Sequence, residues 1–462
     1  MTNLGLNLIN YKMNQNSNHA QPPLEYIPPN FNPWIWRSVK TLLPLWLQWQ
    51  TNIQDIEGKN VAQLANLYQQ FQDGKIRFLM AFRHPSVNDP YCMGYLVWKL
   101  LPKIAKDKKI TLKNPIHSHF IYDRGIPLWA GSGVGWLYSQ LGGTSIQRSK
   151  LDIPGLRSAR ELFANSQFPI AAAPEGATNG HNEIISPLEP GISQLGFWCT
   201  EDLRKANRNE TVFIVPIGIQ YFYISPPWQA IEQLLTQLEK DAGISSQDHS
   251  IDPAKLYKRL YQLGEHFLGV MENFYRQFYH RELPNLPDQT FQERLQKLLN
   301  IGLEVAETYF DLKPKGTMID RCRRLEQAGW EYIYRDDFKE MNKLSSVEKG
   351  LGDRIAEEAS LRMWHMRLVE SFVAVTGYYV KDKPTAERFA DTVLLLWDFV
   401  AKIKGENPLF RPQLGQQKVF ITVGEPLSVS DRFDAYKSNR RQAVTTLTQN
   451  LQDALEKLII HS

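Results

Sequence analysis

A histidine and an aspartate five positions apart are the residues of this chain best suited to catalysis. They are His84 and Asp89, in the segment 82–89. An imidazole that is hydrogen-bonded to a carboxylate can take the proton from a hydroxyl at neutral pH, and the resulting alkoxide can attack an activated acyl group. Pro85 restrains His84 to an extended conformation. The spacing predicts general-base acyl transfer, and a histidine that only satisfies hydrogen bonds of its own loop is the alternative.

Three β-rich runs are expected to position this pair. The runs and the residues that follow them are 76–82 before His84, 169–173 before Glu175 and Gly176, and 211–215 before Pro216. Because these runs alternate with helical stretches, they predict a largely parallel sheet. Ligands of such sheets bind at the carboxyl ends of the strands. We therefore expect His84, Glu175 and Pro216 to converge just past three strand ends.

Between about residues 225 and 415 the pattern changes to apolar residues at helical spacing, and residues 419–423 then return to strand character. The predicted fold is α/β, with a mostly parallel sheet flanked by helices and a large all-helical insertion before the last strand. A separate C-terminal domain that contains a strand is the alternative. The expected divisions are a loose N-terminal arm at 1–33, the α/β domain at 34–224, the helical insertion at 225–415, and the terminal strand and helix of the α/β domain at 416–462.

Four short blocks follow one another between about Lys75 and Tyr223. They are His84 to Asp89, a Gly-rich approach to a strand that ends in Arg148, the turn Ala173-Pro174-Glu175-Gly176, and the apolar run Ile214-Val215-Pro216. In order and spacing they resemble the hallmark blocks of the glycerolipid acyltransferases related to 1-acylglycerol-3-phosphate acyltransferase. The resemblance implies a glycerol-3-phosphate acyltransferase-like fold and a lipid O-acyltransferase of phospholipid biosynthesis.

The resemblance also implies roles for these residues. His84 would be the general base on the acceptor hydroxyl, and Asp89 would orient and stabilise the imidazolium. The donor would be an acyl-coenzyme A or acyl-carrier-protein thioester, with no further cofactor and no metal. Arg148 and the Glu175-Gly176 turn would bind the polar head of the acceptor, since the planar fork of arginine suits phosphate. Pro216 would also belong to the substrate-binding site.

Two positions depart from the family pattern. Thr178 stands where the third block usually carries a second phosphate-binding arginine, and Arg83 stands where an asparagine commonly precedes the histidine. Arg83 or His181 are the candidates to supply the missing charge. The alternative is an acceptor without a phosphate at that place, such as a neutral lipid alcohol. A noncatalytic lipid- or carrier-binding protein on the same fold is the rival from a different class.

Composition indicates a globular protein, with 43% hydrophobic and 22% charged residues in a chain of 462. The net charge of +4 is too small to indicate nucleic acid, and no nucleic-acid partner is expected. Lysines nevertheless cluster at positions 99, 103, 106, 108, 109 and 113, opposed there only by Asp107. Such a cluster suits anionic lipid head groups or an acidic carrier protein. A solvated face is the alternative.

A tryptophan-rich segment is the candidate membrane contact. Trp34, Trp36, Trp46 and Trp49 recur among leucines, and indole rings favour the bilayer interface. Pro44 is expected to break this helix in the middle, and packing of the aromatic rings into the core is the alternative. No apolar run reaches the roughly 18 residues of a membrane span, and the three cysteines and the absence of a signal pattern favour a reducing compartment. A cytoplasmic protein peripheral to a membrane is predicted.

His117, His119 and Asp123 form the candidate metal site, since alternate residues of a strand share a side. The competing interpretation, which we prefer, is that the two histidines are exposed loop residues before a turn. No Gly-x-Ser-x-Gly elbow, dinucleotide fingerprint or phosphate-binding loop occurs in the sequence.

Overall fold

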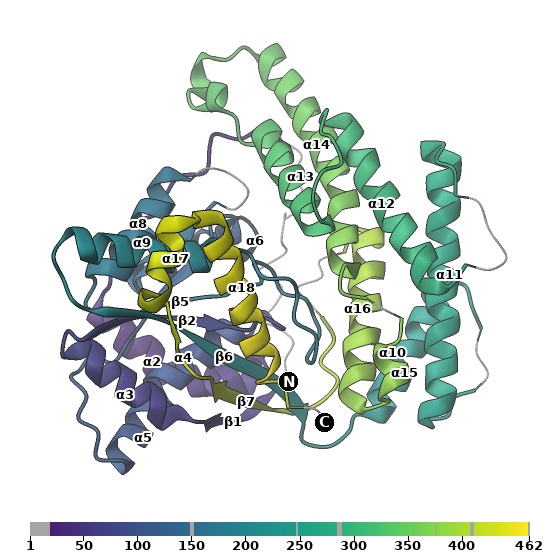
Figure 1. Cartoon of the computed structure of the whole chain (residues 1–462). Helices are drawn as coiled ribbons and strands as arrows, with labels where there is room; N and C mark the ends of the chain where they lie inside the picture. Colours follow the sequence, from purple (N-terminus) through teal and green to yellow (C-terminus); the bar gives the residue numbers. More distant parts are fainter. Residues whose placement is uncertain are drawn as a thin grey trace.

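The computed structural model describes residues 19–147, 152–245, 248–283, 289–375, 377–406 and 411–460. Eight strands of this part of the chain form one mixed sheet in the order β1-β7-β6-β2-β5-β3-β4, with β8 paired to β6 (Figure 1). The strands are β1 Ile53–Lys59, β2 Ile76–Phe82, β3 His119–Asp123, β4 Gly143–Ile146, β5 Ile170–Ala172, β6 Thr211–Tyr223, β7 Gln417–Val423 and β8 Leu427–Ser428. Neighbours from β6 to β4 are parallel, whereas β7 and β8 run antiparallel to β6. The predicted mostly parallel sheet is confirmed.

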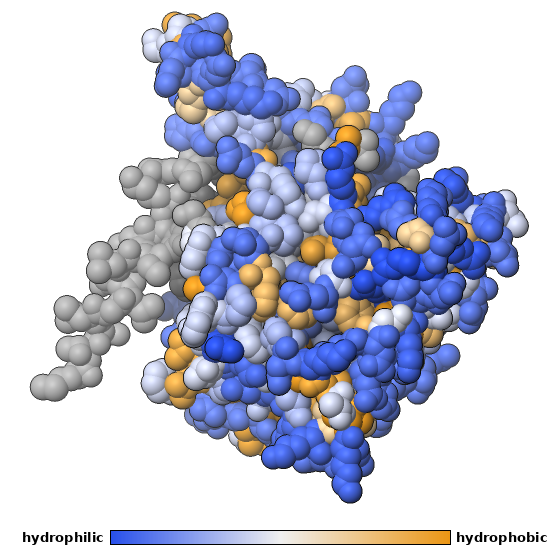
Figure 2. All heavy atoms as spheres, turned by 90° about the vertical axis from the view of Figure 1, so that its left-hand side faces the viewer, coloured by the Kyte–Doolittle hydropathy of each residue, from blue (hydrophilic) through white to orange (hydrophobic). Residues whose placement is uncertain are grey.

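Helices cover both faces of the sheet. One apolar core packs below α2 Pro33–Gln50, α3 Val61–Gln72, α4 Asp89–Tyr95, a π-helical turn at Leu96–Leu100 and α5 Leu101–Asp107. The core on the other face lies below α8 Ile153–Asn165, α9 Gly191–Lys205, α17 Phe433–Ser438 and α18 Arg440–Glu456. The short helices α6 Ile126–Ala130 and α7 Ser132–Gln140 connect β3 to β4. Figure 2 shows one face of the molecule, which is mostly hydrophilic with small separate apolar patches.

A helical block with its own core stands beside the sheet (Figure 1). It consists of α10 Trp228–Asp241, α11 Pro253–Tyr279, α12 Phe291–Tyr309, α13 Met318–Ile333, α14 Ser346–Phe372, α15 Tyr379–Asp382 and α16 Ala386–Lys404. After α16 the chain returns as β7, which enters the sheet between β1 and β6. The helical block is therefore an insertion into the α/β fold, as the sequence predicted.

The segment before α2 ties the two parts together. The amide of Gln21 donates to the carbonyl of Ile333 (2.7 Å), and the amide of Ala20 donates to Asp353 Oδ1 (3.0 Å), so this segment contacts the insertion. Residues 1–18 lie outside the described part of the chain.

Helix α2 is continuous through Pro44, although a break was expected there. Proline removes one intrahelical hydrogen bond and crowds the preceding turn. Leu43 and Leu47, one on each side of the proline, are nevertheless buried in the core below α2. Packing on both sides of Pro44 therefore outweighs its local preference. No helix in the described ranges is long and apolar enough to cross a bilayer.

Strand β6 runs on through Pro216, which was expected to end it. The carbonyl of Ile217 accepts from the amide of Arg83 (3.0 Å), so the nitrogen of Pro216 faces the opposite edge of β6. On that edge the chain turns from β7 into β8 at Gly424, whose amide donates to the carbonyl of Pro216 (2.8 Å). The proline nitrogen faces the gap between β7 and β8, both of which pair with β6 on this edge. No strand there requires a hydrogen-bond donor from residue 216. The prediction that Pro216 follows a strand end was wrong.

Candidate active site

His84 and Asp89 form a hydrogen-bonded pair in the loop that joins β2 to α4. His84 Nδ1 lies 3.0 Å from Asp89 Oδ2, as the spacing predicted. The imidazole is 20% exposed and the carboxylate is fully buried. A carboxylate only accepts hydrogen bonds, so Nδ1 carries the proton and Nε2 is the nitrogen that can take another. The pair has the arrangement that general-base catalysis requires.

Three donors hold the carboxylate of Asp89 in place. Oδ2 accepts from His84 and from the amide of Ser86 (2.8 Å), and Oδ1 accepts from the hydroxyl of Tyr221 (2.5 Å). Burial raises the pKa of Tyr221 well above its ordinary value, so its hydroxyl stays protonated and donates. The carboxylate is thus satisfied and fixed in orientation.

Tyr221 is a functional residue that the sequence prediction missed. It lies in the part of β6 beyond Pro216, where the strand was taken to have ended. The available signal was the period-two alternation that continues after the proline and places Ile217, Ile219 and Tyr221 in the same core. Asn182 fixes this position, because its side chain exchanges two hydrogen bonds with the backbone of Tyr221 (2.7 and 2.8 Å).

Glu175 positions the main chain of the loop that carries His84. Its Oε1 accepts from the amide of His84 (2.8 Å), and its Oε2 accepts from the amide of Ser186 and the side chain of Asn179 (both 2.9 Å). Burial raises the pKa of Glu175, and the nearby Arg83 opposes this rise. With its side chain fully buried, Glu175 holds this loop in place.

Gly176 meets a geometric requirement of the same turn. Its φ is +74°, a conformation that L side chains rarely adopt. A Cβ at this position would lie 2.2 Å from Oε1 of Glu189. The positive φ and this close contact therefore favour glycine beside Glu175.

Arg83 and His181 are both buried beside the pair. The guanidinium of Arg83 donates to the carbonyls of Asn182 (2.6 Å), Ile184 (2.7 Å) and His181 (3.2 Å), and the residue is fully buried. Burial lowers the pKa of His181 to about 4, so its imidazole is neutral at pH 7. Arg83 therefore braces the 181–184 loop. Neither residue presents an exposed positive charge.

A different cation lies at the Gly176 turn, and it comes from the insertion. Arg323 of α13 has an NH2 group 3.1 Å from the place that a Cβ on Gly176 would occupy. Its guanidinium pairs with Glu189 (2.9 Å), Glu370 (3.0 Å) and Glu326 (3.3 Å). Three carboxylates thus offset this single positive charge. Arg148, the predicted head-group residue, lies outside the described residues.

Helix α16 clamps the 181–184 loop and so links the insertion to the pair. Asp391 Oδ2 accepts from the amide of Asn182 (2.9 Å) and from the hydroxyl of Tyr379 (2.8 Å). Arg388 forms an ion pair with Glu183 (2.7 Å). Arg83 donates hydrogen bonds to carbonyls of this loop. By holding the loop, the helical insertion therefore supports the backbone beside His84.

Asp391→Asn is expected to stabilise the protein in a pH-dependent way. Burial raises the pKa of Asp391 to about 7, against the opposing hydrogen bonds from Asn182 and Tyr379. The folded chain therefore keeps a proton that the unfolded chain releases above about pH 4, and stability falls as the pH rises from about 4 to about 7. Asparagine removes this cost, and its Oδ1 can accept both hydrogen bonds.

In thermal unfolding, Asp391→Asn should raise Tm by about 2 to 4 °C at pH 8, and by less than half as much at pH 5. Asp434→Asn is the matched control, since the side chain of Asp434 is 89% exposed, and it should change Tm at neither pH. An equal shift at both pH values would contradict the assignment.

The two histidines of the candidate metal site are buried, so the prediction of exposed loop residues was wrong. Strand β3 lies inside the sheet, between β5 and β4. His117 Nε2 bonds the carbonyl of Leu141 (2.8 Å), and His119 Nδ1 bonds the carbonyl of Gly142 (2.7 Å). Burial lowers the pKa of His117 to about 3. Within the described ranges, no group of three or more His, Cys, Asp or Glu residues could hold a metal ion.

No protein-family model matches this chain and no curated protein matches it in sequence, so the geometry of the His84 site carries the case for a function.

Proposed function

We propose that this protein is an O-acyltransferase that moves a fatty acyl group from an acyl thioester to a hydroxyl of a glycerolipid or lysoglycerolipid. The observation that carries the proposal is the His84–Asp89 pair, with a partly exposed imidazole on a fully buried carboxylate. This is the arrangement of a histidine general base and its orienting partner.

In the proposed reaction, Nε2 of His84 takes the proton of the acceptor hydroxyl as its oxygen attacks the thioester carbonyl. Asp89 stabilises the imidazolium that forms. The tetrahedral intermediate collapses when the carbon–sulfur bond breaks, and the imidazolium returns the proton to the thiolate. The products are an ester and a free thiol, and His84 is regenerated without a covalent acyl-enzyme.

The acceptor is either a phosphate-bearing lysolipid or a neutral lipid alcohol. The environment of the Gly176 turn favours the neutral acceptor. Arg83 and His181 are buried there, and Arg323 forms ion pairs with three carboxylates. A phosphate brought to this turn would meet the negative charge of Glu189 and Glu370. Arg148 remains the predicted phosphate ligand for the first kind of acceptor.

The test is an acyl-transfer assay with the full-length protein. Labelled acyl-coenzyme A and acyl carrier protein are each offered as donors, and lysophosphatidic acid and monoacylglycerol are each offered as acceptors. Ester formation from either donor supports the proposal, and the preferred acceptor identifies the head group. No ester from any donor and acceptor pair would reject catalysis and favour the noncatalytic binding protein.

We also propose that α2 docks on a membrane surface. Trp34 is 74% exposed, Trp49 77% and Trp46 48%, whereas Trp36 is buried in the core. Trp46 lies against Tyr91 of α4, with ring centroids 6.2 Å apart, so this exposed face adjoins the helix that Asp89 begins. Exposed indoles beside the catalytic loop suit a lipid interface.

Basic residues border the same helix. The pKa of Lys40 on α2 is lowered by burial and by the charge of Lys99, so one lysine of the predicted cluster lies near α2. Anionic lipid head groups attract such a cluster. A peripheral membrane protein that receives its lipid substrate at the surface is consistent with both features.

Replacement of Trp34, Trp46 and Trp49 by alanine together should weaken binding to vesicles of phosphatidylcholine and phosphatidylglycerol by about tenfold or more, because exposed apolar area is lost. Co-sedimentation measures the bound fraction. Phe278→Ala removes a 69% exposed aromatic ring from the insertion and should leave binding unchanged. Equal binding of the triple variant and the wild type would reject α2 as the docking element.

A further inference from the structure

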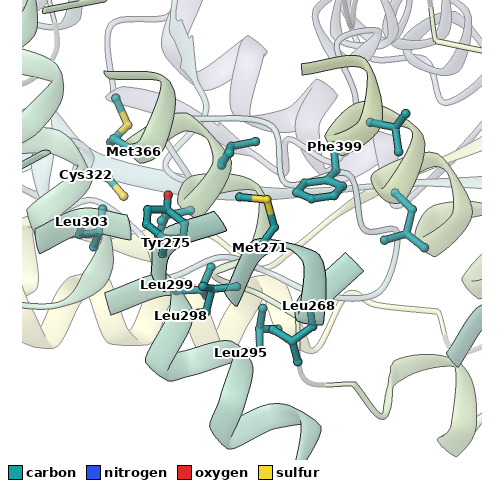
Figure 3. Close-up of a cluster of buried hydrophobic side chains, with 14 of the residues drawn as sticks. Leu268, Met271, Tyr275, Leu295, Leu298, Leu299, Leu303, Cys322, Met366 and Phe399 are labelled. Atoms are coloured by element: carbon teal, nitrogen blue, oxygen red, sulfur yellow. The ribbon is translucent and has the colours of Figure 1, made fainter. Parts of the chain in front are cut away.

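The helical insertion contains an apolar cavity of about 140 Å³. Its wall is formed by α11, α12, α14 and α16, and includes Leu268, Met271, Leu295, Leu298, Leu299 and Phe399. Figure 3 shows these side chains gathered from neighbouring helices into one cluster. The cavity is partly open to solvent rather than sealed within the core.

Hydrocarbon is the chemistry that fits this cavity. An engineered cavity of roughly 150 Å³ lined by Leu, Ile and Phe stays dry and binds benzene. By that measure the cavity holds on the order of six carbon atoms. A space of this size and lining accepts the end of an alkyl chain and offers almost nothing to a polar head group.

The wall of the cavity includes a residue that is hydrogen-bonded to the loop that carries His84. Its wall includes His181 and Tyr379, whose rings are in contact with centroids 5.3 Å apart. The carbonyl of His181 accepts from Arg83 (3.2 Å), the residue before His84. This hydrogen bond joins the wall of the cavity, which lies mostly in the insertion, to the loop that follows β2 of the sheet.

We propose that this cavity binds the methyl end of a single fatty acyl chain, with the chain entering past His181 and Tyr379 from the side of the catalytic loop. This inference rests on the proposed function and adds that the insertion selects the chain of the lipid substrate. Two substrates carry such a chain, the acyl thioester donor and the lysolipid acceptor.

Gly264 of α11 permits a direct test because it lines the cavity. A Cβ at Gly264 would meet only the ring of Phe291, at 3.7 and 3.8 Å, which is ordinary contact. Gly264→Leu should therefore place its side chain in the empty space, and loss of a mid-helix glycine favours the helix. Gly269→Leu is the matched control on the same helix, since nothing lies within 4 Å of a Cβ there.

The experiment titrates the full-length protein with a fluorescent polyene fatty acid. Saturable binding at one site is expected for the wild type and for Gly269→Leu, with affinity weakened by about tenfold or more in Gly264→Leu. Leu395→Phe, which also narrows the cavity, should act in the same direction if Gly264→Leu fails to fold. Competition with lysophosphatidic acid and with a non-transferable thioether analogue of the acyl donor then shows which substrate places its acyl chain in the cavity.

Absence of saturable binding, or equal binding by Gly264→Leu and the wild type, would overturn the inference. The outcome is independent of turnover, because His84→Ala should bind the probe as the wild type does. Saturable binding without acyl transfer would leave the cavity assignment standing and reject the proposed function. Acyl transfer with the same chain-length preference in both glycine variants would reject the cavity assignment alone.

Discussion

His84→Ala is expected to lower kcat for acyl transfer by about 10²- to 10⁴-fold, the usual contribution of a positioned general base. The imidazole is the group on the pair that can accept the hydroxyl proton, since Asp89 is fully buried and its oxygens are occupied by three donors. The variant should bind its lipid substrates normally, so KM should change little.

The control for this experiment is His266→Ala, which removes an exposed imidazole from α11. Both variants should retain the circular dichroism spectrum of the wild type, because His84 is itself partly exposed. Vesicle binding should also be equal in all three proteins. Undiminished transfer by His84→Ala would reject the catalytic assignment. The His84–Asp89 hydrogen bond would then only stabilise its own loop.

The strands that carry the site were predictable because their sequence signals are local. Residues 76–82 form β2 with the predicted bounds, and 170–172 form β5 within the predicted run. Both are continuous apolar runs that end at turn residues, as buried parallel strands require. Their carboxyl ends therefore brought His84 and Glu175 together, and Glu175 bonds the amide of His84.

The parts of the site that escaped prediction depend on distant pairings. Tyr221 lies in β6 beyond Pro216, and the strand continues there because β7 pairs with it after an excursion of nearly two hundred residues. Arg323 reaches Gly176 from the helical insertion, and Asp391 holds the 181–184 loop from α16. Local periodicity contains no information about such partners, since each is set by how the insertion docks on the sheet.

The insertion therefore has three connections to the site. It supplies the ion pair that holds the 181–184 loop, the cation at the Gly176 turn, and most of the apolar cavity whose wall includes His181. A helical block attached only for solubility or partner binding would not need contacts with the 181–184 loop and the Gly176 turn. Its position favours a role in shaping the substrate site.

Asp89→Asn is expected to lower kcat nearly as much as loss of the imidazole, by about 10²- to 10⁴-fold. The amide Nδ2 of asparagine donates where a carboxylate oxygen accepted, so it conflicts with donors at His84, Ser86 or Tyr221. The Ser86 amide can only donate, so Nδ2 turns toward the Tyr221 hydroxyl, which can accept from it. The amide oxygen then still accepts from His84, but it carries no charge to stabilise the imidazolium.

The double variant His84→Ala/Asp89→Asn makes this prediction specific. If Asp89 acts only through His84, the double variant should be no slower than His84→Ala alone, because residues that act as a unit are non-additive. Asp434→Asn, with its side chain 89% exposed, should retain wild-type kcat. A loss below about tenfold in Asp89→Asn, or multiplied losses in the double variant, would show that the carboxylate does not orient the base. Equal rates in the double and the His84 variants would show that Asp89 acts entirely through His84, by orienting its imidazole and stabilising the imidazolium.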